Sequence, residues 1–134
     1  MKALNYKRVL VCGDRRFKDR DTIKSWIQRI EPPPEVIIHG GAEGADSLAA
    51  SIAEELGIRV EEYRADWKTH GKSAGPIRNQ RMLVEGDPDL VLAFPFFDSR
   101  GTADMISRAA TWQWTHVIAI YTELEPPGER TEAH

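Results

Sequence analysis

The chain has 134 residues, of which 29% are charged and 41% hydrophobic, and its formal net charge at pH 7 is -3. This length fits a single domain with one core, so all motifs must share one site or one surface. The negative net charge argues against a dedicated nucleic-acid binder. No apolar run approaches the roughly 20 residues that span a bilayer, and the N-terminus lacks the apolar region of a secretory signal, so we expect a cytoplasmic protein.

Short β-branched runs alternate along the chain with longer segments of helical periodicity, which is the pattern of βαβ units. The runs lie at 8–12, 35–39, 58–63, 89–94 and 116–121. Continuous hydrophobicity is typical of parallel strands covered on both faces, and only 58–63, with three charged residues, resembles an edge strand. The lone cysteine, Cys12, falls in the first run, where we expect it to be buried, and one cysteine excludes an intramolecular disulfide.

Helices are expected at 21–30, at 44–56, from Gly75-Pro76 onward and at 101–114. Asp21 is the expected cap of the first helix, and Pro76 suits the first turn of the third. Residues 122–134 are rich in proline and charge, so we expect a disordered tail. The pattern predicts one three-layer α/β domain over residues 1–121, with a mostly parallel five-stranded sheet.

Glycines and basic residues gather in the loops that follow the expected strands. In a parallel sheet with right-handed crossovers, these loops meet at the carboxyl edge, where ligands of open α/β folds bind. Seven of the ten glycines lie in these loops. The basic residues there are Arg15, Arg16, Lys18, Lys68, Lys72, Arg78, Arg81 and Arg100. Glycine lets backbone N–H groups approach an anion and arginine donates two parallel hydrogen bonds, so the pattern favours a phosphorylated ligand.

Two common phosphate motifs are excluded by their spacing. Gly71-Lys72-Ser73 resembles the end of a Walker A loop, but Asp66 stands where that motif needs its first glycine. Gly13-Asp14-Arg15 lacks the second and third glycines of the dinucleotide fingerprint. The chain also has no paired His, Cys or carboxylate spacing of a metal site, so we expect neither a metal nor a cofactor.

Five blocks, in this order, resemble the YspA-like branch of the SLOG superfamily. They are Gly-Asp-Arg-Arg-Phe at 13–17, His-Gly-Gly-Ala-Glu-Gly-Ala-Asp at 39–46, Ala-Asp-Trp at 65–67, Gly-Pro-Ile-Arg-Asn at 75–79 and Gly-Thr-Ala-Asp at 101–104. The resemblance covers residues 8–121. It implies a Rossmann-like domain that binds nucleotides or nucleotide-derived ligands; relatives include the LOG phosphoribohydrolases and the DNA-processing protein DprA.

The resemblance to LOG enzymes carries over only in part. Gly101 and Thr102 match the Gly-Thr turn of those enzymes, and Arg78 resembles their catalytic arginine. Met105 occupies the place of their glutamate, which leaves Asp104, one residue earlier, as the nearest carboxylate. One helical position is a rotation of about 100°, so we rank ligand binding above catalysis by Arg78 and Asp104.

The expected ligand-binding residues come from all of these loops. They are Gly13, Arg15, Gly40, Gly41, Gly44, Asp46, Asp66, Asn79, Arg100, Gly101 and Thr102. Several alternatives stay open: the three glycines at 40–44 contact phosphate or only permit tight packing, and Asp46 binds a ribose hydroxyl or only caps a helix. Phe96 and Phe97 stack on a base or simply close the site.

Three functional hypotheses follow. The first is binding of a nucleotide or nucleotide-derived phosphorylated ligand at the carboxyl edge of the sheet. The second is a nucleoside monophosphate phosphoribohydrolase of the LOG type. The third, which the negative net charge disfavours, is DprA-like binding of single-stranded DNA. We expect no membrane partner, and the resemblance together with surplus tryptophans is consistent with a homodimer.

Overall fold

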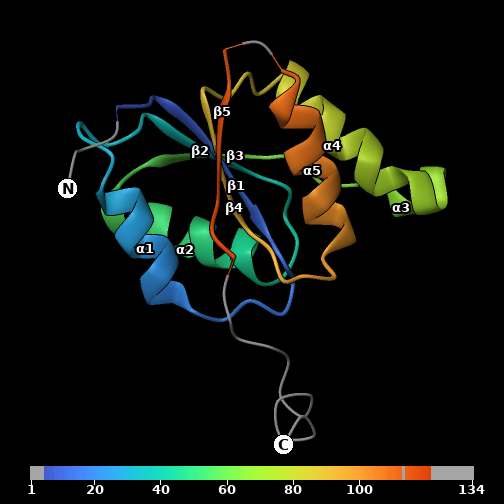
Figure 1. The fold of residues 1–134 in the computed structure, drawn as a ribbon, viewed down its shortest axis with the longest axis horizontal. Helices are drawn as coiled ribbons and strands as arrows, with labels where there is room; N and C mark the ends of the chain where they lie inside the picture. Colours follow the sequence, from blue (N-terminus) through green and yellow to red (C-terminus); the bar gives the residue numbers. More distant parts are fainter. Residues whose placement is uncertain (1–4, 113, 122–134) are drawn as a thin grey trace, which may run out of the picture.

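The computed structural model describes residues 5–112 and 114–121 (Figure 1). The expected disordered tail at 122–134 lies outside the described residues. In chain order the elements are β1 (Arg8–Gly13), α1 (Arg20–Gln28), β2 (Val36–His39), α2 (Ala45–Leu56), β3 (Arg59–Glu62), α3 (Trp67–His70), the 3-10 helix η1 (Gly71–Ser73), α4 (Ala74–Val84), β4 (Leu90–Phe94), α5 (Arg100–Ala110) and β5 (His116–Ala119).

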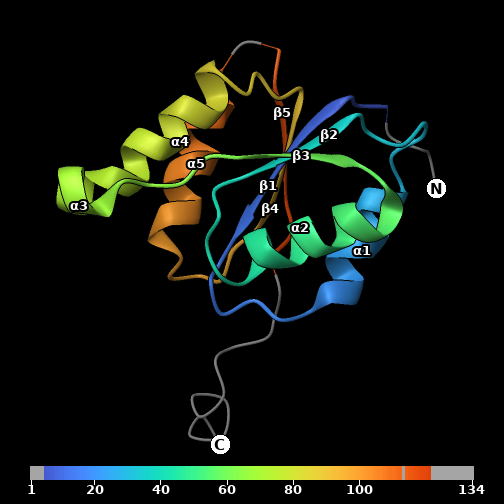
Figure 2. The same ribbon diagram turned by 180° about the vertical axis from the view of Figure 1, so that it is seen from behind.

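The five strands form one parallel sheet in the order β3-β2-β1-β4-β5. Helices α1 and α2 cover one face, and α4 and α5 cover the other (Figures 1 and 2). Val9 on β1 lies opposite Ile37 on β2 and Leu90 on β4, so the three central strands share one buried register. The expected three-layer, Rossmann-like α/β fold is therefore confirmed.

Alternate residues of β1 belong to two separate cores, one on each face of the sheet. Val9 packs with Ile23 of α1 and Ile52 of α2. Leu10 packs on the other face, with Leu83 of α4 and Ala109 of α5. This double coverage explains why the sequence of β1 is continuously hydrophobic.

The helix boundaries differ from the sequence expectation in three places. Helix α1 is capped by Asp19, whose carboxylate accepts the Thr22 N–H at 3.2 Å, and not by Asp21. The short helix α3 precedes α4 and was not expected, because four residues are too few to show a helical period. Helix α5 ends at Ala110, so the exposed Trp114 lies beyond it.

The order of the strands determines where the crevice opens. From β1 the chain proceeds to β2 and β3 on one side of the sheet, and later to β4 and β5 on the other side. The loops that follow β1 and β4 therefore diverge, as they do at the ligand-binding switch point of doubly wound sheets. The switch point between the first and fourth strands agrees with the sequence expectation. Among the described helices, none has the length and apolar character needed to span a bilayer.

Candidate functional site

A cavity of about 480 Å³ opens at the carboxyl ends of β1 and β4. Its volume falls within the roughly 300–1,000 Å³ of small-molecule sites. Four elements or their loops line it, with the residues Cys12, Gly13, Asp14, Arg15, Arg16, Ala42, Asp46, Arg78, Asn79, Met82, Asp98, Ser99, Arg100, Gly101 and Thr102. Four arginines and three aspartates give this lining a formal charge of +1 in a chain whose net charge is -3.

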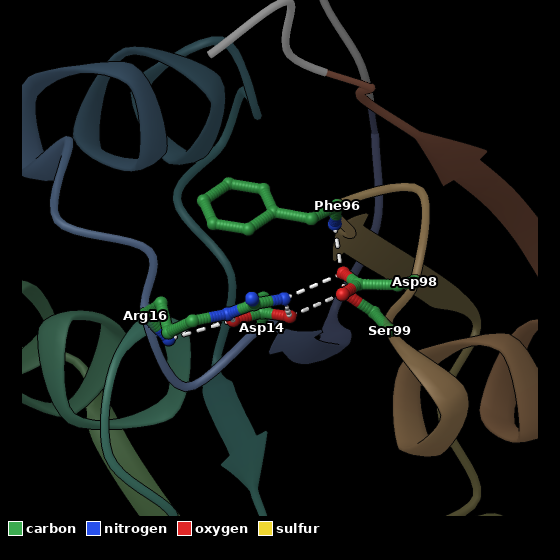
Figure 3. A network of polar contacts seen from close by, with 5 residues as sticks. All are labelled: Asp14, Arg16, Phe96, Asp98 and Ser99. Carbon is green, nitrogen blue, oxygen red and sulfur yellow. Dashed lines mark hydrogen bonds and ion pairs between the residues drawn. The ribbon is translucent and has the colours of Figure 1, made fainter. Parts of the chain in front are cut away.

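The carboxylate of Asp14 lies at the centre of a polar network between the loops after β1 and β4 (Figure 3). Its Oδ1 accepts hydrogen bonds of 2.8 Å from both the backbone N–H and the Nε–H of Arg16. Its Oδ2 accepts from Arg16 Nη2 at 2.8 Å and from the Ser99 hydroxyl at 2.6 Å. The hydrogen bond from the Arg16 side chain lowers the pKa of Asp14 to about 2, although burial opposes the shift.

Arg16 is held on three sides. Besides its pairing with Asp14, its Nη2 donates to Asp98 at 2.6 Å, and its guanidinium lies 5.1 Å from the ring centre of Phe96. The Phe96 ring in turn packs on Phe17, with 6.3 Å between ring centres. Arg16 thus connects the loop after β1 to the loop after β4. Phe96 packs against Arg16 but does not line the cavity.

Among the described residues, two other arginines on the cavity lining, Arg15 and Arg100, lack the salt bridges that hold Arg16. Within residues 5–112 and 114–121, the side chains of Arg15 and Arg100 form no salt bridge, and both residues are exposed. Arg100 begins α5, and the N-cap residue of that helix, Ser99, does not cap it with its side chain. The Ser99 hydroxyl instead accepts the Phe96 N–H at 2.8 Å. The first turn of α5, with Gly101 and Thr102, therefore lines the cavity without a side-chain cap.

Three backbone donors of the glycine-rich loop after β2, those of residues 40–42, have partners inside the protein. The N–H groups of Gly40 and Ala42 donate to Asp46 Oδ2 at 2.8 and 3.3 Å, and the Gly41 N–H donates to His39 Nδ1 at 3.0 Å. Gly40, Gly41 and Gly44 are absent from the lining of the cavity, although all three were expected to contact the ligand. Of the two alternatives for these glycines, the geometry agrees with tight packing.

Close packing also explains why glycine occurs at positions 13 and 44. A Cβ on Gly13 would lie 2.6 Å from the Cβ of Ala45 and 2.8 Å from the carbonyl oxygen of Phe94. Gly44 has a φ of +76°, and a Cβ there would lie 2.4 Å from the carbonyl oxygen of Asp14. These glycines allow α2 to begin directly against β1 and the loop that follows it.

Asp46, in the first turn of α2, lines the cavity and is only 5% exposed. Its carboxylate turns back toward β2, where Oδ2 accepts the two N–H groups of the glycine loop. Burial raises its pKa to about 6, and the two backbone hydrogen bonds and the charge of Arg78 limit this rise. Asp46 is thus a buried acceptor whose pKa is raised to about 6.

Arg78 and Asn79 connect α4 to the two sides of the cavity. Arg78 Nη1 donates to the carbonyl oxygen of Gly40 at 2.6 Å. Asn79 Nδ2 donates to the carbonyl oxygen of Gly101 at 3.2 Å and to Asp104 Oδ2 at 3.0 Å. The structure therefore brings these two expected residues together with the loops after β2 and β4.

Besides the three glycines of the loop after β2, two more of the expected residues, Asp104 and Asp66, do not line the cavity. Asp104 is absent from its lining, and Arg108 Nε donates to Asp104 Oδ2 at 2.8 Å. Partial burial acts to raise the Asp104 pKa, but the hydrogen bonds from Arg108 and Asn79 outweigh it, so this pKa lies below its ordinary value. Asp66 caps α3 by accepting the Thr69 N–H at 3.1 Å, beside a separate cavity of about 150 Å³.

Asp14, Asp98 and Ser99 are site residues that the sequence interpretation did not select. All three lie in loops after strands, so their position at the carboxyl edge was a usable signal. The sequence contains no signal for the contacts that these residues make, because partners such as Asp14 and Ser99 are 85 residues apart in the chain. Phe97, which was expected to stack on a base or to close the site, is 76% exposed and does not line the cavity.

Comparisons with known proteins agree on the family and the fold. The sequence model of the YspA, cpYpsA-related SLOG family matches residues 7–70. The gene 61 protein of Mycobacterium phage D29 is 40% identical over 111 residues, which cover 77% of this chain and 88% of that protein.

The fold is similar to that in the X-ray structure of DNA processing protein A (DprA) from Streptococcus pneumoniae. The TM-score is 0.71 with 20% sequence identity, and the match covers 89% of this chain. It covers 52% of the DprA chain, so the present chain spans about half of that protein. At this identity, the similarity shows the shared α/β fold alone.

Proposed function

The chain belongs to the YspA, cpYpsA-related SLOG family, and we propose that it binds a nucleotide or a nucleotide-derived phosphorylated ligand in the cavity between β1 and β4. The observation that carries the proposal is the pair of exposed arginines, Arg15 and Arg100, on the lining of a cavity whose other charged groups are engaged with the protein. A phosphate supplies the partner that these two guanidinium groups lack among the described residues.

The beginning of α5 supports the same position for the phosphate. Arg100, Gly101 and Thr102 line the cavity in the first turn of this helix, where backbone N–H groups point away from the helix and favour an anion. The corresponding turn of α2 carries Asp46 instead, and the charge of its carboxylate disfavours a bound anion there. The phosphate therefore belongs at the α5 end of the cavity.

Phosphoribohydrolase activity receives less support from the geometry. Arg78 lines the cavity, but its expected catalytic partner, Asp104, does not. Asp104 is engaged by Asn79 and Arg108, and hydrolysis of an N-glycosidic bond needs a carboxylate that reaches the ribose or the attacking water. Binding without turnover is thus the function that these residues fit best.

The first test is a thermal-shift screen with nucleoside mono-, di- and triphosphates, cyclic nucleotides, NAD and ADP-ribose, followed by chromatography of each incubated ligand. We expect at least one compound to raise the melting temperature without being consumed, since a ligand that binds only the folded state stabilises it. Release of free base would identify a hydrolase instead. Failure of all these compounds to stabilise the protein would refute the proposal.

Arginine variants locate the phosphate. In the double variant R15A/R100A we expect the affinity for the stabilising nucleotide to fall by about 100-fold or more, because each of the two lost hydrogen bonds to a charged group contributes roughly 1.5–3 kcal/mol. The matched control is R59A, which removes an exposed arginine at the start of β3, on the opposite edge of the sheet. Equal losses in R15A/R100A and in R59A would place the ligand elsewhere.

Single-stranded DNA is the ligand of the remaining hypothesis. Binding to a labelled oligodeoxynucleotide that falls steeply with salt and is lost in Arg78→Ala would favour it over a mononucleotide.

The cytoplasmic location and the homodimer remain predictions. Sedimentation of the wild type and of Trp114→Ser measures the oligomeric state. Trp114 is the residue to change, because it is exposed next to β5.

A further inference from the structure

The carboxylates around the cavity differ in what they already bind. Asp14 accepts four hydrogen bonds from Arg16 and Ser99 (Figure 3). Asp98 is paired with Arg16, and Asp104 is paired with Arg108 outside the lining. These three carboxylates are engaged in contacts within the protein, and Asp46 differs from them.

Only one oxygen of Asp46 is used by the protein. Oδ2 accepts the N–H groups of Gly40 and Ala42, whereas Oδ1 receives no hydrogen bond from any residue within 5–112 and 114–121. The residue as a whole is 5% exposed, and it belongs to the lining of the cavity. Oδ1 is not one of the fully buried unpaired side-chain atoms of the described residues, so both of its free lone pairs are accessible to hydrogen-bond donors such as those of a ligand.

Charge separates this end of the cavity from the end at α5. A carboxylate repels phosphate, whereas Arg100 and the first turn of α5 attract it, so the ligand lies with its phosphate toward α5 and with hydrogen-bond donors toward Asp46. The donor groups that every ribonucleotide has near its 5′-phosphate are the 2′- and 3′-hydroxyls of the ribose. Two adjacent O–H groups match the two lone pairs of Oδ1.

We propose that Asp46 Oδ1 accepts hydrogen bonds from the ribose 2′,3′-diol of the ligand, so that the cavity selects ribonucleotides over deoxyribonucleotides. This inference rests on the proposed function and goes further, because it names the sugar. The glycine loop has a part in the selection, since its two N–H groups fix Asp46 Oδ2 and thereby direct Oδ1 away from the loop. Asp46 is a specificity residue in this account, and no chemistry at the ligand is required of it.

The test compares matched nucleotide pairs on the full chain. Adenosine, guanosine and cytidine 5′-monophosphates and 5′-diphosphates are each titrated by calorimetry beside their 2′-deoxy and 3′-deoxy counterparts. We expect each deoxy analogue to bind about 10- to 100-fold more weakly than its ribonucleotide, the effect of one hydrogen bond to a charged acceptor. Equal affinities for the ribo and deoxy forms would overturn the inference while leaving the proposed function intact. Absence of binding by every nucleotide would overturn both.

Inosine 5′-monophosphate identifies the donor. It has the ribose of adenosine 5′-monophosphate but lacks the amino group of adenine. If Asp46 accepts from the ribose, the loss caused by removal of the 2′-hydroxyl is the same in both nucleotides. A loss on going from adenosine to inosine monophosphate that disappears in Asp46→Asn, with no ribose effect, would assign the donor to the base and contradict the proposal.

The variant Asp46→Asn tests the residue itself. Its carbonyl oxygen can still accept the N–H groups of Gly40 and Ala42, but its amide presents donors where the diol needs an acceptor. We therefore expect the preference for ribonucleotides to vanish. The matched control is Asp66→Asn, which preserves an N-cap outside the cavity and keeps the preference. An equal weakening of ribo and deoxy forms in Asp46→Asn would show a structural role only, and the wild-type comparison decides the question if this variant does not fold.

Discussion

The hydroxyl of Ser99 donates a hydrogen bond of 2.6 Å to the carboxylate of Asp14, which lies 85 residues earlier in the chain. The same hydroxyl accepts the backbone N–H of Phe96 at 2.8 Å. One buried side chain thus connects the loop after β4 to the loop after β1, on either side of the switch point. These contacts join the two walls of the cavity directly.

Ser99→Ala should destabilise the fold by about 1–3 kcal/mol, because it leaves the Phe96 N–H without its acceptor and removes one donor from Asp14. The measurement is the urea dependence of far-ultraviolet circular dichroism. Ser107→Ala, at an exposed position of α5, is the control, and we expect it to change the free energy of unfolding by less than about 0.5 kcal/mol. Similar values for the two variants would contradict a role of the Ser99 hydroxyl in stability.

Asp14→Asn should lower the stability at pH 7 and should do so less as the pH falls. The pKa of Asp14 is about 2 in the folded protein against an ordinary 3.8, so its ionised form stabilises the fold above pH 4, and this contribution is lost as the pH falls toward 2. Because Arg16 is partly exposed and solvent screens the pair, we expect about 1–2 kcal/mol at pH 7.

The measurement for Asp14 is a series of urea titrations of wild type and variant between pH 7 and pH 2.5. The difference between the two free energies of unfolding should shrink to roughly a third of its value at pH 7 by the acid end of this range. Asp21→Asn, which changes an exposed aspartate in the first turn of α1, is the control for general acid effects. A difference that stays constant with pH would exclude the ion pair as its cause.

Most of the fold could be predicted because its signals are local. The continuous hydrophobic run of β1 reflects packing on both faces, and the charged residues of β3 reflect its place at the edge of the sheet. The position of the α1 cap was less determined, since Asp19 and Asp21 are chemically alike and two residues apart. Only the geometry of the turn selects Asp19, which accepts the Thr22 N–H.

The candidate site could be predicted in its location but not in its contacts. A parallel topology brings the loops together, so the sequence placed Arg15, Arg78 and Thr102 at one edge. It did not reveal that the N–H groups of the glycine loop bind Asp46, because a loop that donates to phosphate and a loop that donates to a carboxylate have the same composition. Contacts between residues far apart in the chain, such as Asp14 with Ser99, produce no pattern in the local sequence.

Gly13→Ala should be strongly destabilising, although alanine suits most strands better than glycine. Its Cβ would lie 2.6 Å from the Cβ of Ala45 and 2.8 Å from the Phe94 carbonyl oxygen, so the backbones of β1, β4 and α2 must separate. Overpacking of this kind costs roughly 1–3 kcal/mol. Gly101→Ala is the matched control, because a Cβ there contacts nothing within 4 Å, and alanine in a helix gains about 0.5–1 kcal/mol over glycine.

The two glycine variants are compared by thermal unfolding followed by circular dichroism. We expect the melting temperature of Gly13→Ala to fall and that of Gly101→Ala to stay equal or rise. Loss of stability in both variants would indicate that the first turn of α5 does not tolerate a side chain either. No loss in Gly13→Ala would contradict the close approach of α2 to β1.

Asp46→Asn should make the fold less sensitive to pH between 4 and 7. Burial raises the pKa of Asp46 from 3.8 to about 6, so the folded protein binds a proton there more tightly than the unfolded chain does. The stabilisation from this group is complete below pH 4 and is lost as the pH rises through 6, an effect of about 3 kcal/mol between the two limits.

Asparagine does not titrate, so the free energy of unfolding of Asp46→Asn relative to wild type should increase from pH 4 to pH 7 and then level off. The substitution can also change the stability by an amount that does not depend on pH. The change with pH is due to Asp46, which among the described residues is the cavity carboxylate with the raised pKa. Parallel pH profiles would mean that Asp46 is ionised in both states at pH 5, and hence that its surroundings are far more polar than its burial implies.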